Sequence, residues 1–222
     1  MRRCVGVRMV REEKRKAMIK NVVFDFGQVM VHFDPAYMVG LSVEDKEDAA
    51  LMERVLFDRL YWDKMDDGTI TDEETVEAVC ARLPQRLHEV AKEIYFDWIH
   101  RLPEIDGMRA LVQDIKRDFG VRTFLLSNIS TYFAAHEDEV PCLVEFEKRI
   151  FSAVCGYVKP KAEMYDYLCR TCDILPEESI FVDDNEKNIR GANAFGIHGY
   201  LFDGDSARLR AYLYDVLKEG RE

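Results

Sequence analysis

The sequence has no long apolar run, no ordered set of cysteines and no excess of positive charge. A transmembrane helix needs about 20 consecutive apolar residues, and no stretch of the 222 residues approaches that length. The formal net charge of -11 would repel nucleic acids and anionic membrane surfaces, so we expect neither as the main partner. An anionic small molecule could bind only where positive side chains gather at one point.

The six cysteines are scattered along the chain rather than arranged as a disulfide framework. Cys169 and Cys172 form a single CxxC pair, but no second pair or histidine partner follows at a spacing typical of zinc sites. Two residues three apart on a helix share one face, so we expect this pair to pack in the core. Since no secretory signal precedes them, the cysteines predict reduced thiols and a cytoplasmic protein.

The chain is organised around a short apolar run that ends in one carboxylate. Residues 21–28 read NVVFDFGQ, and such a run with a glycine behind it is typical of a buried parallel strand. Asp25 is then expected at the carboxyl end of the strand. Ligands of open α/β sheets bind at this edge, so Asp25 is a candidate for chemistry. The alternative is that Asp25 only turns the chain before Gly27.

Two segments around this core have a different character. Residues 1–18 are basic and lack clear periodicity, so we expect an extension, with Met18 as an alternative natural start. From residue 34 to 102 apolar residues recur at helical spacing and no strand pattern interrupts them. Thr71 followed by Glu74 predicts a capping box within this segment. We therefore expect an all-helical insert.

After residue 103 strands and helices alternate. Strands predicted for 121–126 and 179–182 end at polar residues, which are Ser127 and Asn128 after the first and Asp183 and Asp184 after the second. The other predicted elements are a short strand at 150–154 and helices at 107–118, 164–172 and 186–195. This order predicts a three-layer, Rossmann-like α/β core with a parallel sheet and an inserted helical domain.

The polar residues at the strand ends suit phosphoryl transfer. Asp25 can act as a carboxylate nucleophile, and Asp184 can supply oxygen ligands to a hard cation such as Mg²⁺. Ser127 and Lys159 can hold the oxygens of a phosphoryl group. Pro160 restricts the backbone of Lys159, which fixes the direction of its side chain.

Plainer interpretations stay open for several of these residues. Most lysines are solvated at the surface, so Lys159 could be one of them. Ser127 and Asn128 could form only a turn that ends the strand. Asn188 could be a helix residue that faces solvent.

Four motifs occur in the order seen in a known family. They are FDFGQV around Asp25, LLSN at Ser127, YVKPK at Lys159, and FVDDNEKNIRGA at Asp183 and Asp184. On these motifs the chain resembles the haloacid dehalogenase-like (HAD) hydrolases with a helical cap, from about residue 19 to 217. The resemblance implies a hydrolase core at 19–33 and 103–222 and a cap at 34–102.

The resemblance also implies roles for the motif residues. In the family the first aspartate becomes an aspartyl phosphate, so Asp25 is the expected nucleophile. The expected substrate-binding residues are Ser127, Asn128 and Lys159. The expected ligands of a Mg²⁺ cofactor are Asp25, the backbone carbonyl of Gly27, Asp184 and, in support, Asp183.

Gly27 departs from the pattern of the family. Its phosphatases usually have a second aspartate here, which protonates the leaving alcohol. Loss of acid–base assistance lowers the rate roughly 10²–10⁴-fold, on the order of 3–5 kcal/mol. A sugar 1-phosphate has a more acidic leaving group than an alkyl phosphate and would lose less. A DLGNV-type sub-branch that this chain resembles includes sugar-1-phosphate phosphatases, so we expect such a phosphorylated metabolite as substrate.

A replacement acid and a substrate-facing surface of the cap are further expectations. Asp34 is the candidate acid, although the alternative is that it caps a helix beginning at Pro35. Tyr61, Trp62 and Asp63 are the expected substrate-facing residues, or else part of the core of the cap.

Alternative functions also stay open. A 2-haloacid dehalogenase likewise lacks the second aspartate, but its chemistry needs no Mg²⁺, so the acidic pair Asp183 and Asp184 counts against it. A catalytically weak protein that only binds phosphorylated ligands or a partner protein is a further alternative. Gly27 favours it, whereas the joint presence of Asp25, Ser127, Lys159 and Asp184 counts against it. A nucleotide or flavin phosphate is an alternative substrate. We expect a monomer or a homodimer.

Overall fold

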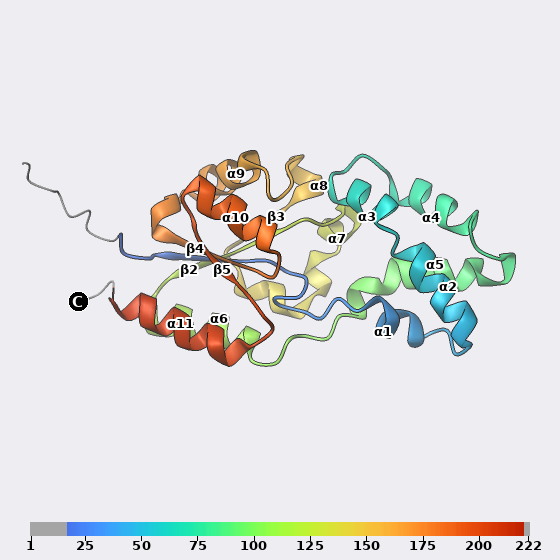
Figure 1. Ribbon diagram of the computed structural model, residues 1–222, viewed down its shortest axis with the longest axis horizontal. Coiled ribbons are helices and arrows are strands. Elements are labelled where there is room, and N and C mark those ends of the chain that lie inside the picture. The colour runs from blue at the N-terminus through green and yellow to red at the C-terminus, as the bar shows by residue number, and fades with distance from the viewer. Residues whose placement is uncertain (1–16, 220–222) are drawn as a thin grey trace, which may run out of the picture.

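The computed structural model describes residues 17–219 and contains a five-stranded parallel sheet (Figure 1). The strands are β1 (Asn21–Phe24), β2 (Arg122–Ser127), β3 (Lys148–Phe151), β4 (Ser179–Asp183) and β5 (His198–Leu201). They lie in the order β3-β2-β1-β4-β5, and every neighbouring pair is parallel. Almost all of the basic segment expected at residues 1–18 lies outside the described residues.

Helices cover both faces of the sheet, because alternate strand residues point to opposite sides. Val22 and Phe24 pack in one core with α6 (Met108–Phe119) and α11 (Ser206–Glu219). Val23 packs in a second core with α9 (Ala162–Cys172) and α10 (Glu186–Phe195). Figure 1 shows these two helix pairs above and below the sheet. The predicted three-layer, Rossmann-like α/β fold is confirmed.

The regular elements of residues 35–100 are all helices, and they lie beside one end of the sheet (Figure 1). Their helices are α1 (Pro35–Gly40), α2 (Lys46–Leu56), α3 (Arg59–Asp66), α4 (Asp72–Cys80), η1 (Gln85–Leu87), α5 (His88–Asp97) and η2 (Trp98–His100). They enclose an apolar core of their own, which includes Met52, Leu56 and Ile94. The capping box of Thr71 and Glu74 opens α4 as predicted. Across residues 17–219, no helix combines the length and the apolar character that crossing a membrane would require.

Short helices fill the connections between β2 and β4. They are α7 (Thr131–Ala135), η3 (Glu137–Glu139), η4 (Pro141–Glu145), α8 (Ser152–Cys155) and η5 (Pro176–Glu178). The strand predicted for 150–154 was placed wrongly: β3 ends at Phe151, and α8 begins at Ser152. β5 was not predicted, because its sequence HGYL forms a partly exposed edge strand without an apolar run.

Gly191 lets helix α10 approach the segment that carries Lys159. A Cβ atom on Gly191 would lie 2.6 Å from the carbonyl oxygen of Pro160 and 3.1 Å from the ring of Tyr165. We expect Gly191→Ala to lower the free energy of unfolding by about 1–3 kcal/mol, because the backbone must shift to make room. Urea denaturation measures this change.

Gly40 provides a matched control in a different helix. A Cβ atom on Gly40 would meet nothing within 4 Å, so Gly40→Ala should leave the stability unchanged or raise it by about 0.5–1 kcal/mol. An unchanged denaturation midpoint for Gly191→Ala would contradict the prediction and would show that the backbone at Pro160 moves aside without loss of stability.

Candidate active site

The polar residues predicted at the strand ends lie together at one edge of the sheet. β1 is paired with β2 on one side and with β4 on the other, with Phe24 opposite both Leu125 and Val182. Asp25 directly follows β1, whereas Ser127 and Asp183 are the last residues of β2 and β4. The carboxyl ends of three adjacent parallel strands therefore meet, as is usual at the ligand-binding edge of an open α/β sheet.

Lys159 is buried between two of these carboxylates. Its Nζ lies 2.7 Å from Oδ1 of Asp25 and 2.8 Å from Oδ2 of Asp183, and its side chain is 1% exposed. Burial acts to lower the pKa of Lys159, but the charges of Asp25 and Asp183 outweigh it and raise the pKa. Lys159 is therefore a buried cation, and the interpretation as a solvated surface lysine is wrong.

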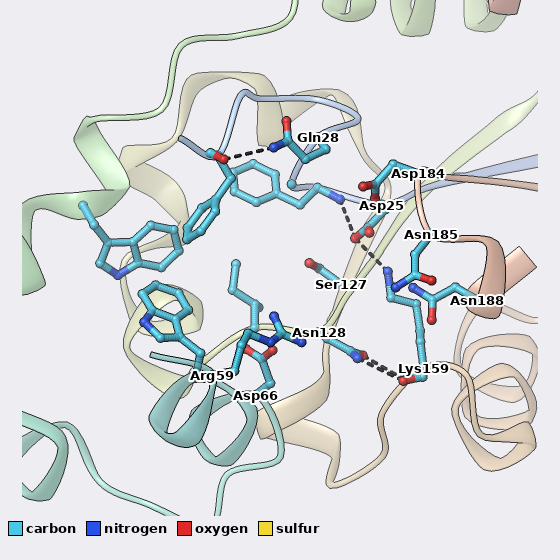
Figure 2. Close-up of a pocket in the computed structure, with 16 residues that line it drawn as sticks. Asp25, Gln28, Arg59, Asp66, Ser127, Asn128, Lys159, Asp184, Asn185 and Asn188 are labelled. Atoms are coloured by element: carbon cyan, nitrogen blue, oxygen red, sulfur yellow. Dashed lines mark hydrogen bonds and ion pairs between the residues drawn. The ribbon is translucent and has the colours of Figure 1, made fainter. Parts of the chain in front are cut away.

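Asn128 holds the backbone of Lys159 in place. The backbone N–H of Lys159 donates to Oδ1 of Asn128 at 2.8 Å, and Nδ2 of Asn128 donates to the carbonyl oxygen of Lys159 at 3.1 Å (Figure 2). The Nζ of Lys159 also lies 5.3 Å from the centre of the Phe181 ring. Asn128 thus lines the pocket while its amide group positions Lys159 rather than being free for a ligand.

The carboxylate of Asp25 has one engaged oxygen and one free oxygen. Oδ1 accepts a hydrogen bond from the backbone N–H of Phe26 at 2.7 Å and pairs with Lys159. Among residues 17–219, no hydrogen bond or ion pair reaches Oδ2. Burial raises the pKa of Asp25, the charge of Lys159 lowers it, and the charge of Asp183 raises it again. An oriented carboxylate with a free oxygen is suited to nucleophilic attack.

Three carboxylates form an acidic cluster beside Lys159. Asp25, Asp183 and Asp184 each offer an oxygen atom, and these atoms lie within 4.8 Å of one another. Burial raises the pKa of Asp184, and the charge of Asp183 adds to the effect. One buried ammonium group leaves an excess of negative charge, and carboxylate oxygens are the ligands that Mg²⁺ prefers. The donor set therefore fits a divalent cation.

Asp183 is also held by the side chain of Asn188, which the sequence analysis considered only as a solvent-facing residue, and by the backbone of Asn185. Asn188 donates to both oxygens of Asp183, at 3.1 and 3.0 Å, and the backbone N–H of Asn185 donates to Oδ1 at 2.8 Å. Asn188 is buried, so its interpretation as a solvent-facing residue is wrong. Its place in the first turn of α10, directly after the acidic pair, was the signal that could have indicated this contact.

These residues line a pocket of about 250 Å³ between the sheet edge and the helical segment (Figure 2). Gly27 also lines it. One wall is aromatic and consists of Phe33, Trp62 and Trp98, whose rings meet edge to face with centroids 5.2 to 6.0 Å apart. Arg59 from α3 contributes a positive charge. The pocket thus combines an acidic floor, an aromatic wall and a cation.

Two sets of expected residues turn out differently. Of the expected substrate-facing residues, Trp62 lines the pocket, whereas Tyr61 is buried in the helical core and Asp63 pairs with Arg59 at the surface. Asp34 does not line the pocket; it is the N-cap of α1, where its Oδ1 accepts from the N–H of Tyr37 at 3.1 Å. Its alternative interpretation as a helix cap is the correct one.

Sequence comparison places the chain among known hydrolases. The family model for haloacid dehalogenase-like hydrolases matches residues 19–196. The D-ribitol-5-phosphate phosphatase of Bacteroides thetaiotaomicron is 26% identical over 205 residues, which cover 82% of this chain and 91% of the relative.

Solved structures share the fold. A predicted HAD-like family hydrolase from Porphyromonas gingivalis has a TM-score of 0.68 at 22% identity, over 90% of this chain and 98% of the other. A HAD family enzyme from Bacteroides thetaiotaomicron, in complex with magnesium and inorganic phosphate, has a TM-score of 0.60 at 20% identity, over 86% and 98%. Since the family match runs from the first strand to the end of α10, the protein is a hydrolase of the haloacid dehalogenase-like family.

Proposed function

We propose that this protein is a Mg²⁺-dependent phosphomonoesterase that forms an aspartyl phosphate on Asp25. The observation that carries the proposal is the buried Lys159, which holds Oδ1 of Asp25 and leaves Oδ2 free at the pocket. We propose a small phosphorylated metabolite as the substrate. We also propose that the protein is a monomer or a homodimer in the cytoplasm.

The proposed reaction has two steps. Oδ2 of Asp25 attacks the phosphorus atom, and the bond from phosphorus to the ester oxygen breaks. The hydroxyl of Ser127 and the ammonium of Lys159 hold the phosphoryl oxygens as negative charge develops on them. Water then attacks the phosphorus of the aspartyl phosphate, which releases phosphate and restores the carboxylate.

We assign the cation to the acidic cluster. Its ligands would be Asp25, Asp184 and the backbone carbonyl of Gly27, with Asp183 in support because its oxygens already accept bonds from Lys159 and its neighbours. When bound, Mg²⁺ would neutralise part of the charge on these carboxylates and on the phosphoryl group. The charge of Lys159 alone does not balance three carboxylates.

We further propose that residues 34–102 act as a cap on a core formed by 19–33 and 103–222. The support is that α3 and the residues around it contribute Arg59, Trp62 and Trp98 to the pocket, opposite the strand ends. A cap in this position would exclude water during phosphoryl transfer and admit it for hydrolysis.

The proposed substrate class is phosphorylated sugars and polyols, and it includes sugar 1-phosphates. A cavity of about 250 Å³ lies below the usual range of roughly 300–1,000 Å³ for drug-sized ligands, so the body of the substrate is small. The relative named a D-ribitol-5-phosphate phosphatase supports this class. The acidic cluster counts against metal-free dehalogenation, which would leave three carboxylates with Lys159 as their single counter-charge among the described residues of the cluster.

Replacing the nucleophile should abolish turnover. We expect Asp25→Asn to reduce phosphate release below about a thousandth of the wild-type rate, since an amide does not form the acyl phosphate. The measurement is phosphate release from sugar 1-phosphates, sugar 5- and 6-phosphates, ribitol 5-phosphate, nucleotides and p-nitrophenyl phosphate, with Mg²⁺ and with a chelator.

The control and the contrary outcomes separate the alternatives. Ser206→Ala, at a residue that does not line the pocket, should keep the full rate. Rapid quenching of the wild type should yield a phosphorylated peptide that contains Asp25. Turnover that survives chelation, or halide release from a 2-haloacid, would contradict the proposal and favour the dehalogenase.

Asn188 should tune the affinity for the cation. Asn188→Ala removes two hydrogen bonds from Asp183, and loss of such an outer partner typically weakens metal binding about 10–100-fold. Calorimetric titration with Mg²⁺ measures the affinity, and Lys187→Ala, an exposed change in the same helix, is the control. Equal affinities for Asn188→Ala and the wild type would exclude Asp183 from the metal site.

A further inference from the structure

Gly27 leaves the proposed reaction without a proton donor for the leaving oxygen. When ribitol 5-phosphate or most sugar phosphates react, the sugar or polyol leaves as an alkoxide. This alkoxide needs a proton as the ester bond breaks. The pocket-lining residues within 17–219 include no histidine, tyrosine, cysteine or glutamate, and their carboxyl groups belong to Asp25, Asp184 and Asp66. The first two are assigned to attack and to the cation. Asp66 is the remaining acid.

Asp66 approaches the site from the helical segment. It is the last residue of α3, and it lies beside Arg59 on the wall opposite Asp25 and Asp184, with Ser127 between the two sides (Figure 2). A phosphoryl group bound at Ser127 would therefore have the nucleophile on one side and Asp66 on the side toward which the ester oxygen leaves. This is the in-line order that the displacement requires.

The backbone of Asp66 is tied to the core. Its carbonyl oxygen accepts a hydrogen bond from Oγ of Ser152, and the same Oγ accepts from the backbone N–H of Ile129 at 2.9 Å, two residues beyond Ser127. Two residues further along the chain, Gly68 packs so closely that a Cβ atom would lie 3.0 Å from the carbonyl oxygen of Ala153. Asp66 is therefore held at a fixed place relative to the phosphate-binding strand end.

The surroundings of the Asp66 carboxyl group suit it to donate a proton. Within residues 17–219 it makes no side-chain hydrogen bond or ion pair. Burial raises the pKa of Asp66 to about 7, although the charge of Arg59 lowers it, the charge of Asp63 raises it, and Lys159 and Asp67 have smaller effects. Near neutral pH the group can hold a proton and release it, as general acid catalysis requires.

We propose that Asp66 is the general acid of this enzyme and replaces the aspartate that is absent at Gly27. As Oδ2 of Asp25 bonds to phosphorus, the ester P–O bond breaks and its electron pair goes to the leaving oxygen. That oxygen takes the proton of the Asp66 carboxyl group. In the second step the Asp66 carboxylate accepts a proton from the attacking water, which restores both groups. This inference rests on the proposed phosphatase function.

The decisive experiment compares leaving groups in Asp66→Asn, which preserves shape and removes the acid. The measured quantity is the rate of alcohol release in the first turnover. We expect release from a sugar or polyol phosphate to fall roughly 10²–10⁴-fold, whereas release of p-nitrophenol should change less than about threefold, since this leaving group needs no proton. Asp66→Glu should restore part of the rate on the sugar phosphate.

The pH dependence of alcohol release is a second test of the role of Asp66. The acid acts only while protonated, so wild-type release of a sugar alcohol should fall as pH rises through the pKa of Asp66, and this alkaline limb should be missing in Asp66→Asn. Arg59, Asp63, Asp67 and Lys159 are the charged groups around Asp66. Asp63→Asn, on the same helix but outside the pocket, should retain the limb.

Two results would overturn the inference. Equal losses for sugar phosphate and p-nitrophenyl phosphate would indicate that Asp66 is only structural, and no loss on either substrate would place the acid elsewhere. A wild-type protein that releases phosphate from no ester at all would instead overturn the proposed function, and with it this inference.

Discussion

The ammonium group of Lys159 lies buried between the carboxylates of Asp25 and Asp183, and the arrangement of the site depends on it. Removing one partner from a buried ion pair costs about 3–5 kcal/mol, so these groups hold one another in place. The Asn128 amide and the close approach at Gly191 fix the backbone around the same cation. The floor of the pocket is therefore organised before a ligand arrives.

The core of the site could be predicted because it follows from local patterns. Apolar runs ahead of Asp25, Ser127 and Asp183 produced buried strands, and parallel strands bring their carboxyl ends to one edge. Lys159 is a different case. Its positive charge and the proline after it made it a candidate, and the resemblance to a family supported it, but nothing in YVKPK indicates that its side chain is buried. β5 escaped prediction because an exposed edge strand needs no apolar run.

The side of the pocket that the helical segment contributes could not be predicted in the same way. Arg59 and Asp66 lie on a helix whose charged residues mostly face solvent, and the local sequence does not distinguish an inward carboxylate from its exposed neighbour Asp63. Their direction is set by how α3 packs against α8, through Ser152, across a long separation in sequence. Such contacts belong to tertiary packing rather than to any motif.

The aromatic wall has a spectroscopic consequence. The protein has two tryptophans, and both Trp62 and Trp98 line the pocket, with ring centroids 5.5 Å apart. Trp98 stacks in turn on Phe133, and that ring contacts Phe26, the residue after Asp25. The ultraviolet fluorescence of the indole rings thus originates entirely at the site, so the protein carries its own optical reporter of the space above Asp25.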